Sequence, residues 1–500
     1  MKLAHAVSRR VHVVARDDGL LGLADDRGAE GARTVGTVPP SYPEWLGDRG
    51  FLAAHDVRFP YVAGEMAQGI ATPDLVVAMA RAEMLAFYGA AGLGMDDLGR
   101  GVDTLADRLS GRRNWGVNLL HMPEDPAGED QVADVLLRKR VPRISASAFL
   151  DVTPALARCA AKGLRQDRSG EVTRPVSVFA KVSRPELAKM FFSPAPAGVL
   201  RYLVERGQLT EDEARLARHV PLAEDVTVEA DSGGHTDGRP LVALLPTVLA
   251  LRDTAPLGGR VRVGAAGGLG DPAGVAAAFA LGADYVLTGT VNQMSVEAGI
   301  SARAKDMLAR ATVADTAMAP SAAMFELGAQ VQVLRRGTLF AARAGRLRAL
   351  YDTYPSVEAI PAAELARVER ELWGAPVEQV WEQTRAYWSD RNPAALDRAE
   401  SDPKHRMALI FRWYLGLSNR WAISGSDRTV DYQLWCGPAA GAFNAWVAGS
   451  FLSDGRQRTV AQIALNLLQG AAVLTRAHQL RTLGVRLPQQ AFVFRPRRLR

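Results

Sequence analysis

Glycine turns that follow predicted β-strands are the first sign of chemistry in this 500-residue chain. In the stretch 260–290, Gly267 and Gly268 follow one short β-branched run, and Gly289 and Thr290 follow the next. Turns without side chains let backbone N–H groups approach a phosphate, and the last strand ends of an α/β barrel commonly hold one. The glycine spacing is not that of a Rossmann fingerprint, and no Gly-Lys-Ser/Thr of a P-loop follows. The pattern predicts a phosphate site, and a tight βαβ turn that binds nothing is the alternative.

Polar side chains are expected at other strand ends. Asn118 can hydrogen-bond the edge of a flat ring, and Lys181 can place positive charge where negative charge develops on a reduced ring. The turns at 64–67 and 89–92 lack bulk, so a flat ring could lie over the barrel mouth beside them. A phosphate, a flat ring and no metal-binding pattern together point to FMN.

His235 stands in the segment DSGGHTD, directly after Gly233 and Gly234. The glycines permit an unusual backbone turn and a close approach by a substrate. An imidazole can donate a proton or a hydrogen bond near neutral pH, so His235 is a catalytic candidate. A structural histidine bonded to a nearby carbonyl is the alternative.

Eight short strand patterns alternate with helix patterns, and this alternation predicts a (β/α)₈ TIM barrel of the α/β class. A helical insertion at 184–220 follows strand five, and a helix near 296–310 is expected to close the barrel. The predicted strands are 61–63, 84–88, 115–120, 143–147, 176–182, 226–230, 261–263 and 285–288.

The chain divides into four expected segments. Residues 1–40 have weak periodicity and are expected to form an irregular lead-in, and 41–315 hold the barrel. Residues 316–490 have no convincing strand pattern and predict an α-helical extension, followed by a basic tail at 491–500. The aromatic clusters within the extension are interpreted as core, because aromatic side chains dominate core burial.

Composition excludes several classes of protein. The 60 basic and 54 acidic residues give a net charge of +6 with no long basic run, which argues against nucleic acid and would suit an acidic protein partner. Two distant cysteines, Cys159 and Cys436, argue against a disulfide framework and favour a reducing cytoplasm. No signal peptide, metal-binding pattern or apolar stretch of membrane-spanning length is seen, so a cytoplasmic protein without a metal is expected.

Longer stretches resemble a known family. EADSGGHTD, VRVGAAGGLG and VLTGTVNQ resemble the nitronate monooxygenase (2-nitropropane dioxygenase-like) superfamily of FMN barrels. FYGAAGLG, WGVNLLH, AKVSRPELAKMFFSPAP, FRWYLGLSNRWA and DYQLWCGPAAGAFNAW are similar to the PfaD family within it, the trans-acting enoyl reductases of polyunsaturated fatty acid and polyketide synthases. The resemblance extends over residues 40–485.

The resemblance implies an FMN-dependent enoyl reductase that takes electrons from NADPH. Hydride would pass from the flavin to the β-carbon of an enoyl thioester on an acyl carrier protein, and a proton would reach the α-carbon. His235 matches the SGGH histidine, a candidate for polarising or protonating the substrate. The expected cofactor contacts are Gly64, Met66, Gly89, Ala90, Asn118, Lys181, Glu229, Gly233, Gly234, Gly267, Gly268, Leu269, Gly289 and Thr290. A homodimer is left open.

Glu65 departs from the family pattern, since a small residue is expected there beside the flavin. Two other functions remain open at this point: a nitronate monooxygenase-like flavin oxidase, because fold alone does not decide function, and a flavin-free docking scaffold. A docking face for the carrier protein is expected on the insertion, with a solvated helix face as the alternative. Its candidate residues are Arg201, Arg206, Arg215 and Arg218.

Overall fold

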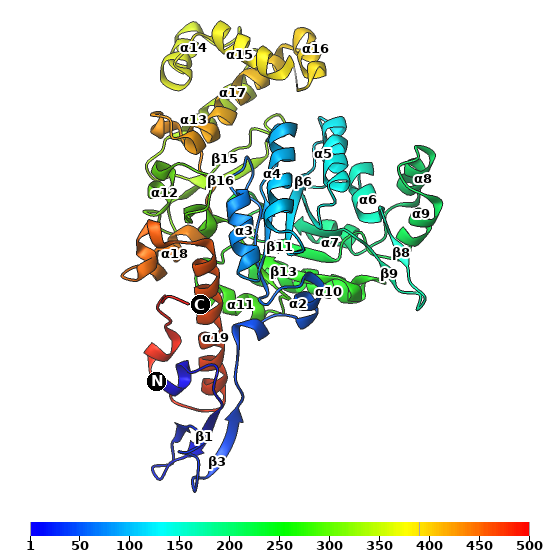
Figure 1. Ribbon diagram of the computed structural model, residues 1–500. Helices are drawn as coiled ribbons and strands as arrows, with labels where there is room; N and C mark the ends of the chain where they lie inside the picture. Colours follow the sequence, from blue (N-terminus) through cyan, green and yellow to red (C-terminus); the bar gives the residue numbers. More distant parts are fainter. Residues whose placement is uncertain (1, 390, 500) are drawn as a thin grey trace. The chain divides into compact units, whose positions relative to one another are not determined.

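The computed structural model describes residues 2–389 and 391–499 and divides into two compact units. The first unit consists of Met1–Asp231, Arg239–Ala298 and Ala442–Arg500. The second consists of Ser232–Gly238 and Gly299–Gly441. The barrel strands all lie in the first unit, which Figure 1 shows mainly in blue, cyan and green.

Eight parallel strands close into a barrel in the order β10-β11-β13-β14-β4-β5-β6-β7, as the alternating pattern predicted. The ends of the observed strands differ from the predicted ends by at most a few residues. The strands are β4 (Tyr61–Ala63), β5 (Leu85–Tyr88), β6 (Trp115–Leu120), β7 (Arg143–Ser147), β10 (Ser177–Val182), β11 (Asp225–Glu229), β13 (Arg262–Ala266) and β14 (Val286–Thr288).

Three of the helices between the strands begin at capping side chains that the sequence made recognisable. Thr72, Thr153 and Asp271 each accept a backbone N–H of the first turn, and a proline follows each cap. The helices that begin at these caps are α3 (Pro73–Arg81), α6 (Pro154–Ala161) and α11 (Pro272–Ala280). The others between the strands are α4 (Met95–Arg108), α5 (Pro126–Arg138) and α10 (Leu241–Thr254).

The insertion after β10 contains the three expected helices. They are α7 (Pro185–Phe191), α8 (Ala197–Glu205) and α9 (Glu211–Ala217). Thr210 and Glu213 form a capping box at the start of α9, which fixes where that helix begins. A small hairpin of β8 (Arg165–Gln166) and β9 (Val172–Thr173) precedes β10.

The barrel interior is a packed core. Phe51, from the short helix α2 (Arg49–His55), stacks on Tyr285 with ring centroids 4.5 Å apart. Phe87 and Phe179 fill the space beside them, and all four side chains are fully buried. The strands therefore present chemistry at their ends rather than along a pore.

A buried charge network lies at the amino-terminal ends of the strands. Asp225 accepts hydrogen bonds from Arg262 at 2.7 and 2.8 Å, and its Oδ2 lies 3.0 Å from Nε2 of His55. Arg143 donates to Nδ1 of His55 at 2.9 Å, so the histidine proton lies on Nε2 and points to Asp225. This network ties α2 to the starts of β7, β11 and β13.

The helix expected at 296–310 does not close the barrel. The chain there forms a 3₁₀ turn, η3 (Thr290–Met294), and α12 (Ala302–Leu308), and α12 belongs to the second unit. The long C-terminal helix α19 (Val460–Thr482) instead packs against α11 and α3 (Figure 1). A Cβ on Gly470 would lie 2.5 Å from Cγ of Pro272, so glycine at this position permits the close approach of α19 to α11.

Residues 2–40 form ordered structure rather than the expected irregular lead-in. A short helix, α1 (Lys2–His5), precedes an antiparallel sheet of β1 (Val11–Ala15), β2 (Leu21–Ala24) and β3 (Thr34–Val38). The buried Arg476 of α19 donates to the carbonyls of Val7, Arg9 and Pro39. The basic end is not a free tail either: Trp446 donates to the Phe494 carbonyl, and the Arg497 N–H binds Asn466.

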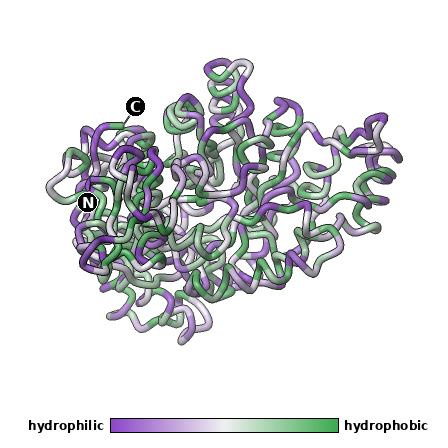
Figure 2. The backbone as a smooth tube through the Cα atoms, turned by 90° about the horizontal axis from the view of Figure 1, so that it is seen from below, coloured by the Kyte–Doolittle hydropathy of each residue, from purple (hydrophilic) through white to green (hydrophobic). Residues whose placement is uncertain are grey.

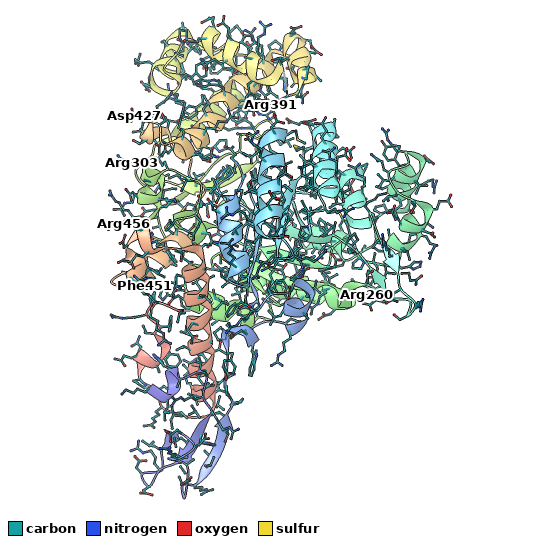
Figure 3. All side chains as sticks on the ribbon, viewed as in Figure 1. Arg260, Arg303, Arg391, Asp427, Phe451 and Arg456 are labelled. Atoms are coloured by element: carbon teal, nitrogen blue, oxygen red, sulfur yellow. The ribbon has the colours of Figure 1, made fainter. Side chains whose placement is uncertain are left out.

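The second unit is mainly helical but contains a sheet that the sequence did not reveal. β12 (Gly234–His235), β16 (Gln330–Leu334) and β15 (Thr316–Pro320) pair antiparallel. Its helices include α13 (Phe340–Thr353), α14 (Ala362–Val368), α15 (Val377–Ser389), α16 (Pro393–Ser401) and α17 (Pro403–Ser424); α18 (Ala439–Val447) follows at the return to the first unit. Phe411 and Tyr414 of the aromatic cluster at 411–421 are buried in one core, as expected, and Trp373 is buried with them. Exposed polar side chains of this unit include Arg303, Arg391 and Asp427 (Figure 3).

No helix among the described residues is long and apolar enough to cross a membrane. Hydrophobic and hydrophilic residues are interspersed along the backbone, as the green and purple segments of Figure 2 show. The described residues also hold no group of three or more histidine, cysteine or acidic side chains that could bind a metal ion.

Candidate functional site

A cluster of charged side chains lies at the carboxyl ends of the barrel strands. Nζ of Lys181, near the end of β10, lies 3.2 Å from Oε1 of Glu65 and 3.4 Å from Oε1 of Glu229, the last residue of β11. The Lys181 side chain is only 13% exposed. Burial opposes its charge, but the carboxylates of Glu229 and Glu65 outweigh burial and hold the pKa of Lys181 above its ordinary value. Lys181 therefore carries a full positive charge at neutral pH.

Glu65 reaches across the barrel mouth. It follows β4, whereas its partners stand on β7 and β10: Ser145 and Ser147 of β7 donate to its Oε1 at 3.0 and 2.6 Å. Its second oxygen, Oε2, is buried and has no hydrogen-bond partner among the described residues. Sequence reasoning noticed Glu65 only as a departure from a family pattern.

The glycine turns after β13 and β14 are open to a ligand. Gly267 and Gly268 have φ of +91° and +72°, a conformation that glycine adopts without strain. A Cβ on Gly268 or on Gly289 would meet no atom within 4 Å, so the space above both turns is free. Within the described part of the chain, the N–H groups of Gly268, Leu269 and Gly289 have no hydrogen-bond acceptor. Free backbone donors with open space above them are what an anion-binding site requires.

The N-terminus of α11 is not part of this anion site. Asp271 accepts the N–H of Gly274 at 2.8 Å and places its own carboxylate there. The 3₁₀ turn η3 begins at Thr290, directly after Gly289. The two glycine turns lie side by side, because β13 and β14 are neighbours in the barrel.

Other residues that were expected to contact the cofactor also have neighbours within the protein, and these neighbours account for the residue types. A Cβ on Gly64 would lie 2.5 Å from Leu287, and one on Gly89 would lie 1.7 Å from the Met66 carbonyl. Both glycines, with Met66, are buried, so close packing at the ends of β4 and β5 requires them. Oδ1 of Asn118 accepts the N–H groups of Ala90 and Ala91 at 2.9 and 3.1 Å. This bond holds the turn after β5 and leaves the Asn118 amide nitrogen as the donor for a ligand.

His235, Gly233 and Gly234 belong to the second unit. Nε2 of His235 lies 2.8 Å from the hydroxyl of Ser321, a residue that is 1% exposed, while His235 itself is exposed. Gly234 has a φ of +85°, and a Cβ on Gly233 would lie 2.8 Å from the Cys436 nitrogen. The glycines therefore allow β12 to pack beside residues 436–437, and Ser321 orients the imidazole.

The arginines expected to dock a carrier protein are solvent-exposed, but two of them have local partners. Arg206 lies over the Tyr202 ring, 5.3 Å from its centroid, and Arg215 pairs with Asp212 at 3.2 Å. These contacts fit the alternative of a solvated helix face equally well.

Burial raises the pKa of both thiols, Cys159 and Cys436, to about 12, so neither is a thiolate nucleophile.

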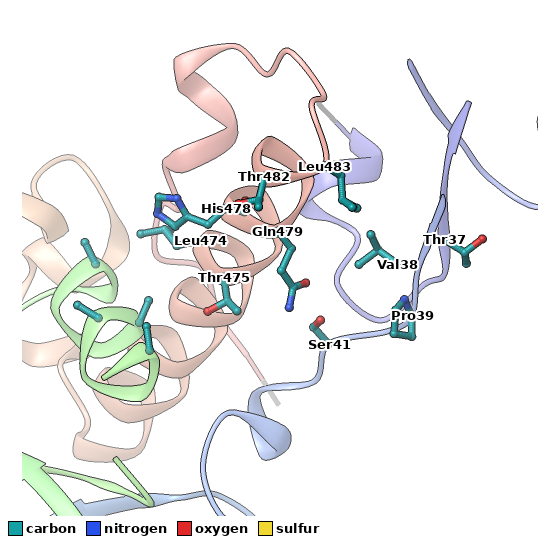
Figure 4. Close-up of a pocket in the computed structure, with 14 residues that line it drawn as sticks. Thr37, Val38, Pro39, Ser41, Leu474, Thr475, His478, Gln479, Thr482 and Leu483 are labelled. Atoms are coloured by element: carbon teal, nitrogen blue, oxygen red, sulfur yellow. The ribbon is translucent and has the colours of Figure 1, made fainter. Parts of the chain in front are cut away.

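A cavity of about 690 Å³ lies outside the barrel, between α11, α19 and residues 37–41 (Figure 4). Alanine side chains of α11, among them Ala273 and Ala277, line one wall, and Leu474 with His478 of α19 lines another. The cavity contains none of the charged or glycine-turn residues at the strand ends.

The residues at the strand ends fit FMN. Free N–H donors with open space above them suit its phosphate, and the cation Lys181 suits the electron-rich edge of its ring. Gly268, Leu269 and Gly289 would hold the phosphate, and Lys181 and Asn118 would hold the ring. Glu65 is compatible with this arrangement because its carboxylate accepts hydrogen bonds from Ser145 and Ser147.

Comparison with known proteins agrees with this architecture. The inserted helical domain of [acyl-carrier-protein] S-malonyltransferases matches residues 354–432, which include α14 to α17. A polyunsaturated fatty acid synthase chain of Thraustochytrium is 42% identical over 483 residues, which cover 94% of this chain and 32% of the relative. The polyketide biosynthesis protein PksE of Bacillus subtilis is 43% identical over 437 residues, 86% of this chain and 56% of the relative. The chain thus spans between a third and three fifths of the length of these relatives.

Two solved structures are similar. FabK from Thermotoga maritima has a TM-score of 0.51 at 20% identity and covers 87% of this chain and 97% of its own, which shows the fold alone. The enoyl reductase domain of MlnA, from the macrolactin cluster of Bacillus amyloliquefaciens, has a TM-score of 0.83 at 34% identity. The match covers 88% of this chain and 99% of that domain. Because this chain accounts for almost the whole of that domain at this identity, it belongs to the PfaD-type enoyl reductase family.

Proposed function

We propose that this protein is an FMN-dependent oxidoreductase that reduces the α,β-double bond of an enoyl thioester with NADPH. Its substrate is carried on an acyl carrier protein of a polyketide or polyunsaturated fatty acid synthase. The observation that carries the proposal is the charged Lys181, held between two carboxylates at the same end of the barrel as the glycine turns with free N–H groups. The relatives named for polyketide and fatty acid synthases support the choice of pathway class.

When bound, FMN would accept hydride from NADPH and deliver it to the β-carbon of the substrate. The protein residues supply binding and charge. The N–H groups of Gly268 and Gly289 would donate hydrogen bonds to the phosphate, and the ammonium of Lys181 would supply positive charge at the ring edge where negative charge develops.

His235 is the proposed proton donor to the α-carbon. It is exposed, and its Nε2 contacts the buried Ser321 hydroxyl at 2.8 Å, so the ring has a defined orientation. Replacing a positioned general acid typically slows the step it serves about 10²- to 10⁴-fold. The flavin of His235→Ala should therefore still be bleached by NADPH, but this variant should reduce the thioester about 10²-fold more slowly or worse.

The test is anaerobic spectroscopy of the purified protein supplied with FMN. NADPH should bleach the flavin bands, and a crotonyl thioester on a carrier protein should restore them. Lys181→Met should bind FMN at least about tenfold more weakly, because it removes the cation at the ring edge. Lys162→Met is the matched control, since Lys162 also pairs with a glutamate, Glu213, but outside the barrel mouth.

The other outcomes would contradict the proposal in distinct ways. Bands that recover only with oxygen, together with oxygen uptake on a nitronate, would indicate a flavin oxidase. Failure to bind FMN at all would indicate a docking scaffold.

A further inference from the structure

Glu65 is the charged group at the barrel mouth that the binding roles above do not use. In the closed ring of eight strands, β4 and β10 are four places apart and so stand on opposite sides of the barrel. The pair of Glu65 with Lys181 therefore spans the mouth, directly above the packed interior. A flat ring bound over the mouth would lie on this pair.

Glu65 adds a negative charge beside Lys181. The ammonium of Lys181 faces the carboxylates of Glu65 and Glu229. Ser145 and Ser147 also face Glu65, but both are neutral donors. The charged groups in contact with Lys181 among the described residues are thus the two glutamates.

Stability alone does not account for Glu65. Its side chain is 4% exposed, and its Oε2 is buried without a hydrogen bond. A buried carboxylate oxygen without a partner costs folding free energy, and such a group in a native structure calls for another explanation. A second carboxylate is also not needed to pair Lys181, because Glu229 already does so.

We propose that Glu65 is a positioning residue that holds Lys181 across the mouth and lowers the reduction potential of the flavin bound there. The inference rests on the proposed function, since it requires FMN at this mouth. Reduction adds negative charge to the flavin ring, and the buried carboxylate of Glu65 would oppose that charge in a site of low dielectric. A lower potential makes the reduced flavin a stronger hydride donor to the enoyl thioester.

Glu65→Gln isolates the charge. Glutamine keeps the length of the side chain and an oxygen that can accept from Ser145 and Ser147. The substitution removes one negative charge from beside Lys181, and the ammonium is then freer to pair with the reduced ring. Reduced FMN should gain about tenfold in affinity relative to oxidised FMN, which for a two-electron couple is a rise of about 30 mV in potential.

The experiment measures two quantities on reconstituted protein: the dissociation constant of oxidised FMN and the midpoint potential of the bound flavin. Glu224→Gln is the matched control, because Glu224 pairs with Arg174 at the other end of the same strand, β11. Glu65→Asp keeps the charge, and Glu229→Gln removes the other carboxylate of the cluster.

The expected result is a higher potential for Glu65→Gln and Glu229→Gln, with Glu65→Asp and Glu224→Gln close to the wild type. A potential unchanged in Glu65→Gln, with FMN bound normally, would overturn this inference and leave the proposed function intact. An equal shift in Glu65→Asp would assign the effect to shape and overturn it as well. If Glu65→Gln does not fold, the potential of Glu229→Gln decides on the charge. Wild-type protein that binds no FMN would remove the proposed function and this inference with it.

Discussion

Replacing Asp225 by asparagine should destabilise the barrel unit by about 3 kcal/mol, because it leaves the largely buried guanidinium of Arg262 without a carboxylate partner. Asp225 is fully buried and accepts two hydrogen bonds from Arg262 and one from His55. An asparagine can still accept from Arg262, but its NH₂ group would face the N–H of His55. Two donors then point at each other in a site without solvent.

The magnitude follows from two independent arguments. Burial alone would raise the pKa of Asp225, but His55 and Arg262 outweigh it and lower the pKa from 3.8 to about 2, which corresponds to about 2 kcal/mol. Removing one partner of a buried ion pair typically costs about 3–5 kcal/mol. The lower end is appropriate because asparagine retains part of the hydrogen bonding to Arg262.

The assay is urea denaturation at pH 7, followed by a probe in the barrel unit, with Asp212→Asn as control. Asp212 is 84% exposed and pairs only with Arg215, so its replacement should change stability by less than about 0.5 kcal/mol. The pH dependence gives a second test. Because the folded pKa of Asp225 lies below its unfolded value near 4, its contribution is present above about pH 4 and is lost as the pH falls toward 2. A loss of unfolding free energy below about 1 kcal/mol in Asp225→Asn would refute the reasoning. An unfolding free energy that falls between about pH 4 and pH 2 as steeply in this variant as in the wild type would refute it as well.

Three further predictions test other parts of the structure. Gly470→Ala should destabilise the barrel unit by about 1–2 kcal/mol, because its Cβ would lie 2.5 Å from Pro272 and the gain in helix propensity offsets only part of this steric overlap. Thermal unfolding measures the loss, and Gly416→Ala, where a Cβ meets no atom within 4 Å, is the control. Gly268→Ala should lower the unfolding free energy by only about 1 kcal/mol, the strain of alanine at a φ of +72°, which urea denaturation measures. It should weaken FMN binding about tenfold in a flavin titration, because the new Cβ enters the open space above the turn. Burial, together with Arg143 and Arg262, outweighs Asp225 and lowers the pKa of His55. The unfolding free energy should therefore fall as the pH drops below about 6.5. His55→Gln should make the unfolding free energy from urea titrations less dependent on pH in this range.

The sequence was sufficient to predict the barrel strands and the positions of the glycine turns that follow two of them. Each strand is a short β-branched run between a capped helix and a glycine turn, so its limits are set by local chemistry. Gly267 and Gly289 were recognisable for the same reason: the turn, the strand before it and the helix after it are contiguous in the chain.

Long-range pairs were not predictable in the same way. The sequence placed Lys181 at a strand end but could not show that Glu65 lies opposite it, because only the closure of the barrel brings β4 and β10 to face each other. Nor did it distinguish Gly64 and Gly89, which close packing requires, from Gly268 and Gly289, which leave space for a ligand. A glycine in a turn has the same local pattern in both cases.

The helix that closes the barrel shows why element order alone is insufficient. Counting strands and helices along the chain assigned the last position to residues 296–310, yet the chain leaves the barrel unit after Ala298 and returns at Ala442. α19 then fills the place between α11 and α3, and its buried Arg476 binds three carbonyls of the N-terminal segment. That segment is therefore fixed to a helix more than four hundred positions further along the chain. Since α19 is synthesised after the whole helical unit, the barrel core cannot be covered completely until the residues between β14 and α19 have been made.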